Sequence, residues 1–372
     1  MKICLIGPSY PFRGGIAHYT TLLYRELRKR HHVTFYGFRR QYPSWLFPGK
    51  TDVDESKIPI CENGVESVLD SMNPLSWWSV FRRIRQVDPD LVILPWWVSF
   101  WTPQFRAISS LVKRLTRAKI LFICHNVVPH ESKYVDRLCT KFVLKKGDYF
   151  IVHSDEDLRN LKRVVPDAHV KKAFHPTYDV FNYGKTAKEA ARRDLDVEGN
   201  VVLFFGFVRP YKGLKYLIEA MPLILSTMDV TLLVVGEFWE DKREYVRLIT
   251  ELEIGDRVRI IDEYVPNEDV GLYFAASDVV VLPYLSGTGS GIAQLAFGFN
   301  KPVIGTNVGC LPEVIDDGRT GFVVNPQRAD TIADAVIRFY EGNKEGEFVK
   351  AILEERDRFS WDRTVEAIGA FL

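Results

Sequence analysis

The sequence of 372 residues lacks the features of membrane-spanning, disulfide-bonded and zinc-stabilised proteins. No apolar run reaches the about eighteen residues that a membrane span requires. The opening stretch, MKICLIGPSYP, is too short in its apolar part for a signal peptide and predicts a buried first strand. The five cysteines (4, 61, 124, 139 and 310) are odd in number and form no C-x-x-C pair. These absences favour a reducing, cytoplasmic setting.

Motifs for metal-dependent or acid–base catalysis are also scarce. His125, His130 and Glu131 lack the spacing of a helical metalloprotease site. The D-x-D pairs at 88–90 and 155–157 are expected at a strand entry and a helix start. No Ser-His-Asp or Cys-His arrangement follows from the spacing of the residues. We therefore expect no metal site.

The overall charge hides a strong asymmetry. Residues 1–175 contain 28 Lys and Arg against 16 Asp and Glu, a net charge of +12. The remaining residues contain 21 against 32, a net charge of −11. A basic half suggests an anionic partner such as phosphate, nucleic acid or a membrane surface.

Short apolar runs alternate with helical patterns along the whole chain. Runs that are apolar throughout are typical of parallel strands buried on both faces, and the intervening helices complete βαβ units. The runs are 2–7, 32–38, 90–95, 119–125, 148–153, 201–206, 230–236, 257–262, 279–283, 301–305 and 321–324. They predict two doubly wound α/β domains facing each other across a cleft, with ligands bound beyond the strand ends.

We expect an N-terminal domain over residues 1–176, a C-terminal domain over 177–355 and a C-terminal helix over 356–372 that packs back on the first domain.

The first predicted strand of the second domain is followed by GFVRPYKG, which starts at Gly206. Arg209 and Lys212 are cations at a strand end beside a helix start, a combination that suits a diphosphate. A solvated basic turn is the alternative.

The stretch PYLSGTGSGIAQLAFG, residues 283–298, is rich in glycine and contains no acid, base or cation. Its Ser290, Gly291 and Ile292 are expected in the first turn of a helix, with free N–H groups directed at a ligand. Thr288 adds a hydroxyl donor. We predict that this helix start holds the diphosphate opposite Arg209 and Lys212.

In the first domain, Gly14 and Gly15 precede a helix and either bind an anion through backbone N–H groups or form a simple helix-entry turn. His125 follows a core strand and is a candidate active-site residue. In the second domain Glu237 and Glu313 also follow strands and could accept hydrogen bonds from sugar or ribose hydroxyls. Glu237 could equally begin a solvated charged helix.

Six of the eight tryptophans lie in the segments 43–49, 74–78 and 95–105 of the basic half. They could stack on sugar rings, bind an anionic membrane together with neighbouring cations, or pack the core. We expect a protein that is cytoplasmic and associates with the inner face of the membrane.

Taken together, these motifs resemble the retaining, nucleotide-sugar-dependent glycosyltransferases of the GT-B fold, in glycosyltransferase family 4. The resemblance covers nearly the whole chain and rests on Gly14-Gly15, His125, the turn Arg209–Gly213, the stretch KPVIGTNVGCLPEVIDDGRTGFVV and the tail Phe359-Ser-Trp361.

The resemblance implies that the second domain binds a UDP- or GDP-linked sugar and that the first binds a glycan or lipid-linked acceptor. It implies that backbone groups near Tyr264 and Val265 meet the base, that His125 lies near the transferred sugar, and that no metal is needed. The reaction would belong to polysaccharide or glycolipid biosynthesis.

The family's two glutamates that contact donor sugar and ribose are replaced here by Gly287 and Leu295. A subset of the family carries a Ser-Gly-Ile loop of this kind. Gln294 and Glu313 are the nearest substitutes. The loss leaves two alternatives to a transferase: a non-catalytic nucleotide-sugar-binding subunit and a nucleotide-sugar epimerase of the same fold. A nucleic-acid partner does not fit the strand-end cations of the acidic half.

Overall fold

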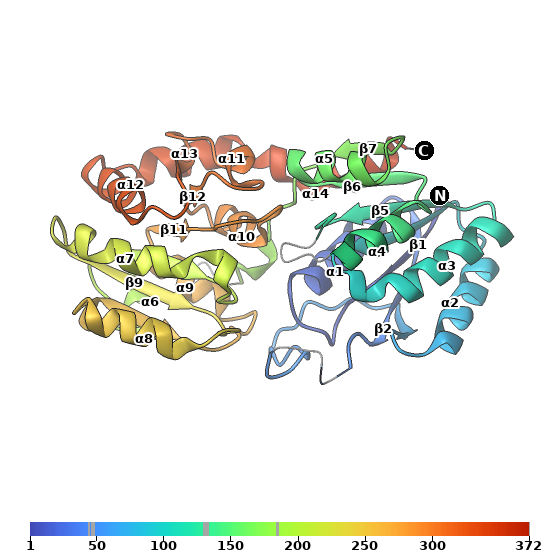
Figure 1. The fold of residues 1–372 in the computed structure, drawn as a ribbon, viewed down its shortest axis with the longest axis horizontal. Coiled ribbons are helices and arrows are strands. Elements are labelled where there is room, and N and C mark those ends of the chain that lie inside the picture. Colours follow the sequence, from blue (N-terminus) through green and yellow to red (C-terminus); the bar gives the residue numbers. More distant parts are fainter. Residues whose placement is uncertain (44, 46–48, 129–133, 184–185, 372) are drawn as a thin grey trace. The chain divides into compact units, whose positions relative to one another are not determined.

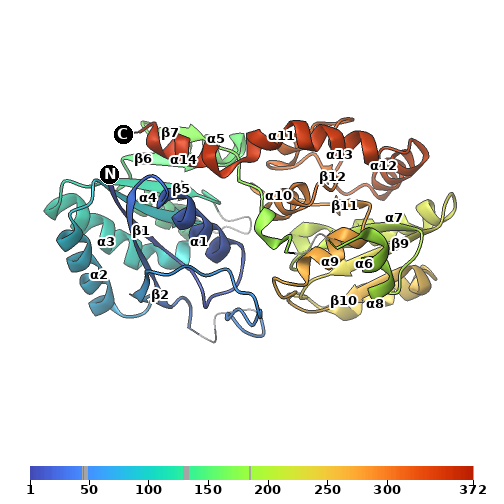
Figure 2. The ribbon, with the colours of Figure 1, turned by 180° about the vertical axis from the view of Figure 1, so that it is seen from behind.

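The computed structural model divides into two α/β units. Unit 1 comprises residues 1–55, 59–174 and 361–372, and unit 2 comprises residues 56–58 and 175–360. Each unit contains one parallel sheet with helices packed on it (Figures 1 and 2). The structure describes residues 1–43, 45, 49–128, 134–183 and 186–371. No helix in these ranges is both long enough and apolar enough to cross a bilayer.

The sheet of unit 1 has seven strands in the order β3-β2-β1-β4-β5-β6-β7. Its strands are β1 (Lys2–Gly7), β2 (His32–Arg40), β3 (Val65–Asp70), β4 (Leu91–Trp96), β5 (Lys119–Cys124), β6 (Tyr149–Val152) and β7 (His169–Lys172). Its helices are α1 (Gly15–Leu27), α2 (Pro74–Val87), α3 (Thr102–Leu115), α4 (Tyr134–Leu144), α5 (Asp155–Val164) and α14 (Trp361–Gly369), with a 3₁₀ turn at Ser99–Trp101.

Two hydrophobic cores cover the two faces of this sheet. One is filled from α2, α3, α4 and α5 by residues such as Phe81, Ile108 and Leu161. The other is filled from α1 and from α14, whose Ile368 is fully buried. The last helix of the chain therefore belongs to unit 1 (Figures 1 and 2). In the sequence, residues 175–360 of unit 2 lie between this helix and the rest of unit 1.

The sheet of unit 2 has six strands in the order β10-β9-β8-β11-β12-β13. They are β8 (Asn200–Phe205), β9 (Val230–Val235), β10 (Val258–Ile261), β11 (Val279–Leu282), β12 (Val303–Thr306) and β13 (Gly321–Val324). The helices are α6 (Lys188–Asp194), α7 (Leu214–Leu225), α8 (Lys242–Glu251), α9 (Val270–Ala276), α10 (Gly291–Gly298), α11 (Leu311–Val314), α12 (Ala329–Glu341) and α13 (Glu345–Glu354). Short 3₁₀ turns occur at Asp179–Phe181, Pro210–Lys212, Gly255–Arg257 and Arg356–Phe359.

The predicted α/β fold class is confirmed by these two parallel sheets. All eleven strands expected from apolar runs are present, but β3 and β7 were not predicted. Both are edge strands that remain partly exposed and carry polar residues, in VESVLD and HVKK. Because β3 and β7 are covered less completely than the other strands, their sequences lack the continuous apolar run of a buried strand.

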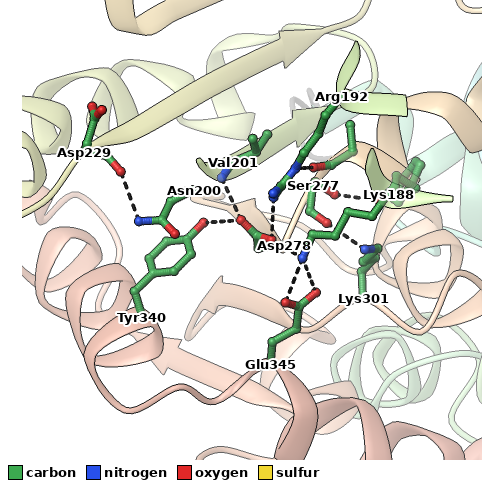
Figure 3. Close-up of polar contacts among 12 residues, drawn as sticks. Lys188, Arg192, Asn200, Val201, Asp229, Ser277, Asp278, Lys301, Tyr340 and Glu345 are labelled. Atoms are coloured by element: carbon green, nitrogen blue, oxygen red, sulfur yellow. Dashed lines mark hydrogen bonds and ion pairs between the residues drawn. The ribbon is translucent and has the colours of Figure 1, made fainter. Parts of the chain in front are cut away.

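An ionic network around the buried Asp278 lies at the end of the unit 2 sheet where its strands begin (Figure 3). Asp278, directly before β11, forms ion pairs with Lys188 and, at 2.8 Å, with Arg192. It also accepts hydrogen bonds from the backbone N–H of Val201 at 2.7 Å and the hydroxyl of Tyr340 at 3.0 Å. This network links α6 and α12 to the beginnings of the strands. The predicted donor-binding residues follow the opposite, carboxyl ends of the strands.

Candidate active site

In each sheet the strand order reverses beside the first strand of that unit. The reversal lies between β1 and β4 in unit 1 and between β8 and β11 in unit 2. At such a point the loops after the two strands diverge and leave room for a ligand at the carboxyl ends of the strands. In unit 2 the two diverging loops are residues 206–213 and 283–290, which are the two segments that the sequence singled out.

Gly213 brings these two loops of unit 2 together. Its φ of 68° is a left-handed conformation, and a Cβ on it would lie 2.0 Å from the carbonyl oxygen of Pro283. The backbone N–H of Leu285 donates a hydrogen bond of 2.7 Å to the carbonyl of Tyr211. A glycine is needed here because any side chain would separate the two loops.

Lys212 is a buried cation at this junction. Its side chain is 8% exposed, and its Nζ lies 5.6 Å from the centre of the Tyr284 ring. Burial, with a further contribution from the positive charge of Arg209, lowers the pKa of Lys212 from 10.5 to about 8. Among the described residues no acidic side chain forms an ion pair with it. A buried ammonium beside a second cation is a candidate site for an anionic ligand.

Arg209 lies next to a group of three aromatic rings, of which the sequence had pointed only to Tyr264. Its guanidinium is 5.5 Å from the ring of Trp239, and Trp239 stacks on Phe207 with centroids 4.2 Å apart. Phe207 in turn stacks on Tyr264 at 6.0 Å. Phe207 follows β8, Trp239 follows β9 and Tyr264 follows β10, so three neighbouring strand ends each supply one ring. The three rings form an aromatic platform beside the cations.

Helix α10 begins at the same junction. Ser290 is its N-cap, and the hydroxyl oxygen accepts a hydrogen bond of 3.2 Å from the N–H of Ala293. A Cβ on Gly206 would meet Ile292 Cδ1 and Lys212 Nζ, each at 3.1 Å. The first turn of α10, with Gly291 and Ile292, therefore lies beside the end of β8 and the buried lysine. Its N–H groups present partial positive charge there.

The remaining predicted donor-binding residues of unit 2 lie in the segments that follow the carboxyl ends of its strands. Thr288 is buried in the loop before α10, Glu237 is buried at the end of β9, and Val265 is buried after β10. Glu313 lies in α11, where its carbonyl accepts a hydrogen bond from Arg358.

The two positions without glutamate differ in their surroundings. A Cβ on Gly287 would have Tyr284 Cδ2 as its nearest neighbour, at 3.8 Å, so a side chain would fit there. Leu295 is buried inside α10. Next to it, the side-chain oxygen of Gln294 is buried and accepts no hydrogen bond from the described residues. A buried acceptor of this kind suits a hydroxyl donor on a ligand.

Three predicted site residues belong to unit 1. Gly14, with φ of 106°, is the N-cap of α1, and Gly15 is the first residue of that helix. A Cβ on either glycine would meet no atom within 4 Å, so neither is needed for close packing. Both follow β1, at the reversal point of this sheet.

His125, directly after β5, is buried against Tyr19, with ring centroids 4.5 Å apart, and lies 5.2 Å from the ring of His153. His153 follows β6 and was not singled out from the sequence. Its Nδ1 lies 2.8 Å from the carbonyl oxygen of Ala173, and burial lowers its pKa to about 4. His153 is therefore neutral at pH 7, and a neutral imidazole faces His125. His130 and Glu131 lie outside the described residues.

The six clustered tryptophans of unit 1 divide between core and surface. Trp96 and Trp101 are fully buried, while Trp77 and Trp97 pack against the same core. Trp45 and Trp78 are exposed. The core interpretation is therefore right for most of segment 95–105, and the exposed rings are the ones available to a partner.

Two Rossmann-like units, with a buried lysine, an arginine and a helix start at the reversal point of one sheet, define an α/β protein with a positively charged candidate site at the strand ends of unit 2. Residues 13–171 match the model of Glycosyltransferase Family 4, and residues 199–342 match that of Glycosyl transferases group 1. The chain belongs to these group 1/family 4 glycosyltransferases and is a glycosyltransferase.

Curated relatives support this assignment. The chain is 25% identical over 313 residues to D-inositol 3-phosphate glycosyltransferase of Corynebacterium glutamicum, covering 78% of this chain and 73% of the relative. It is 29% identical over 210 residues to spore coat protein SA of Bacillus subtilis, covering 52% and 54% of the two chains.

Solved structures share the fold over the whole chain. Sucrose-phosphate synthase from Thermosynechococcus elongatus superposes with a TM-score of 0.75 at 20% identity, covering 100% of this chain and 98% of that one. Anabaena HepE in complex with UDP-glucose superposes with a TM-score of 0.75 at 17% identity, covering 100% of both chains. The chain has the GT-B fold.

Proposed function

We propose that the protein is a retaining glycosyltransferase that moves a hexose from a UDP- or GDP-linked donor to a glycan or lipid-linked acceptor without a metal ion. Unit 2 would bind the donor, and unit 1 would bind the acceptor. The observation that carries the proposal is the buried, depressed-pKa Lys212 beside Arg209 and the start of α10. Solved HepE carries UDP-glucose on the same fold.

The diphosphate of the donor would lie at Lys212, Arg209 and the first turn of α10, where two cations and free N–H groups stabilise the negative charge of the leaving group. The nucleobase would stack on the half-buried platform of Phe207, Trp239 and Tyr264, in the way that bases stack on aromatic side chains. Thr288 and Ser290 would donate hydroxyl hydrogen bonds, while Glu237, Gln294 and Glu313 would accept hydrogen bonds from the hydroxyls of sugar and ribose.

The reaction needs no carboxylate acid, because a nucleoside diphosphate leaves readily once its charge is stabilised. The bond from the sugar carbon to the donor phosphate oxygen breaks, and a bond to the acceptor oxygen forms on the same face of the sugar. The acceptor proton passes to the departing phosphate oxygen. His125 and the glycines at 14 and 15 would act near the transferred sugar.

The test is release of nucleoside diphosphate from a panel of UDP- and GDP-hexoses with glycan and lipid-linked acceptors, with and without EDTA. We expect Lys212→Ala to lower turnover at least about 100-fold, the loss typical of a removed electrostatic stabiliser. Lys215→Ala is the matched control, because Lys215 is exposed on α7 and pairs with Glu219 at 3.7 Å. Its turnover should stay within about two-fold of wild type.

A decrease of only a few-fold for Lys212→Ala would contradict the diphosphate site. Loss of product with EDTA would contradict the metal-independent mechanism. Donor binding without turnover on every acceptor would favour the non-catalytic subunit.

A further inference from the structure

Helices α2, α3 and α4 form a basic layer on one face of the unit 1 sheet. α3 lies between α2 and α4 (Figures 1 and 2). The three helices contain eight Lys and Arg and one acidic residue, Asp136, which accepts a hydrogen bond from Ser99. The next helix of the layer, α5, is mixed in charge, with acidic residues at 155–157 and basic residues at 159, 162 and 163.

Helix α4 exposes apolar side chains on its outer side. Val135, Leu138 and Phe142 are each at least half exposed, and their spacing of three and four residues lines them up along one side of the helix. Val143 and Leu144 of the same helix are fully buried against the core. A surface helix normally directs its apolar side chains toward the core alone, so the outer stripe requires another explanation.

Helix α2 repeats this combination. Its exposed side carries Leu75, which is 78% exposed, and Trp78, followed by Arg82 and Arg85. Trp78, Phe81 and the two arginines line a shallow groove of about 510 Å³. Tryptophan with arginine neighbours is typical of side chains that lie at the boundary between lipid headgroups and acyl chains.

We propose that the outer surface of α2, α3 and α4 binds the surface of a bilayer rich in anionic lipids. Leu75, Trp78, Leu138 and Phe142 would enter the headgroup region, and the surrounding cations would contact lipid phosphates. This inference stands independently of the proposed transferase activity.

The distribution of charge favours lipid over a protein partner. Apolar and cationic side chains alternate on this surface: the Arg106 guanidinium lies 3.9 Å from the centre of the Phe142 ring. Charged residues are depleted in the centre of a protein interface, whereas they accompany the apolar residues of an interfacial membrane helix. The spread of the apolar residues over two helices, each beside cations, therefore fits an extended anionic surface.

The test is co-sedimentation of the full chain with vesicles of phosphatidylcholine alone or with phosphatidylglycerol added to about a third. A cation near an anionic surface contributes about five-fold to partitioning, so the triple variant Arg82→Gln, Arg85→Gln, Lys141→Gln should bind mixed vesicles about 100-fold more weakly. Leu138→Ser with Phe142→Ser should weaken binding about ten-fold or more. Raising the salt to about 0.5 M should also weaken it.

The matched control neutralises three exposed cations of unit 2, Lys215, Arg243 and Arg247, and should bind within about three-fold of wild type. All variants should retain melting temperature and donor turnover on a water-soluble acceptor, which separates docking from catalysis.

Failure of the wild-type protein to bind the mixed vesicles at low salt would overturn the proposal. So would binding to pure phosphatidylcholine that equals binding to the mixed vesicles, or a loss of binding in the unit 2 control that equals the loss in the Arg82, Arg85 and Lys141 variant. A self-association in sedimentation velocity that Leu138→Ser with Phe142→Ser abolishes would show instead that this surface binds a second copy of the chain.

Discussion

Replacing Lys212 with methionine should make the protein more stable while it destroys activity. The ammonium of Lys212 is buried next to Arg209, and a buried charge without an opposite charge destabilises the folded state. Methionine keeps much of the packing of the aliphatic stem but removes the charge. Residues of a binding site often reduce stability for the sake of function, and Lys212 is expected to be one of them.

The size of the effect follows from the pKa. Its fall from 10.5 to about 8 in the folded protein corresponds to about 3 kcal/mol of unfavourable interaction of the charged form, at 1.36 kcal/mol for each pH unit. Lys212→Met should therefore raise the free energy of unfolding by up to about 3 kcal/mol at pH 7, where the lysine is charged in both states.

The pH dependence gives the reasoning a second test. Between about pH 8 and 10.5 the unfolded wild-type protein holds more protons at this residue than the folded protein, so wild-type stability rises with pH relative to the variant. The advantage of Lys212→Met should fade through this window. A bound diphosphate favours the charged lysine, so the affinity of wild type for UDP or GDP should fall above pH 8, by up to about ten-fold for each pH unit.

The assay is urea unfolding of wild type and variant at pH 7 and pH 10.5, with the binding of UDP and GDP measured by calorimetry. Lys215→Met, on the exposed side of α7, is the control and should change neither stability nor affinity appreciably. A Lys212→Met protein that is less stable than wild type at pH 7, or whose difference does not change with pH, would refute the assignment of an unfavourable buried charge.

Two further predictions concern the framework of unit 2. Asp278→Asn should lower the free energy of unfolding by about 3 kcal/mol in urea denaturation, because it removes the buried carboxylate that pairs with Arg192 and Lys188, of which, among the described residues, only Lys188 keeps a second ion pair, with Glu345. Asp330→Asn at the surface should leave the midpoint unchanged. Equal midpoints for both variants would contradict the role of the network. Gly213→Ala should lower the free energy of unfolding by more than about 2 kcal/mol and also lower turnover, since its Cβ would collide with the carbonyl of Pro283. The control Gly346→Ala, at the start of α13, should change the free energy of unfolding by no more than about 1 kcal/mol. A fully active and stable Gly213→Ala protein would refute the close approach of the two loops.

The sequence predicted those parts of the fold whose physical cause is local. Inner strands such as β1, β4 and β8 are covered on both faces, so the pattern of apolar residues alone reveals them. The edge strands β3 and β7 form by pairing with a neighbouring strand and are not completely buried. No pattern in their sequences indicates that pairing.

Part of the candidate site was predictable because ligand-binding residues of parallel α/β sheets tend to follow the carboxyl ends of the strands. This rule identified Arg209, Lys212 and the start of α10, and applied consistently it would also have found His153. Phe207 and Trp239 were missed because a single aromatic residue after a strand is no signal by itself. The two rings come into contact only because β8 pairs with β9. Composition could not separate buried from exposed tryptophans in unit 1, since burial depends on which helix face each ring occupies.

The position of α14 has a consequence for biosynthesis. Its Trp361 lies 5.2 Å from the ring of Tyr19, and its Val365 and Ile368 are buried against α1 and the unit 1 sheet. A ribosome makes these residues only after the segment 175–360 that forms nearly all of unit 2. Although unit 1 is synthesised first, one face of its sheet stays partly uncovered in the nascent chain. Unit 1 therefore cannot complete its fold until nearly all of unit 2 has been synthesised, and until α14 packs, apolar residues on the α1 face of its sheet stay exposed to the aggregation that partly folded chains undergo.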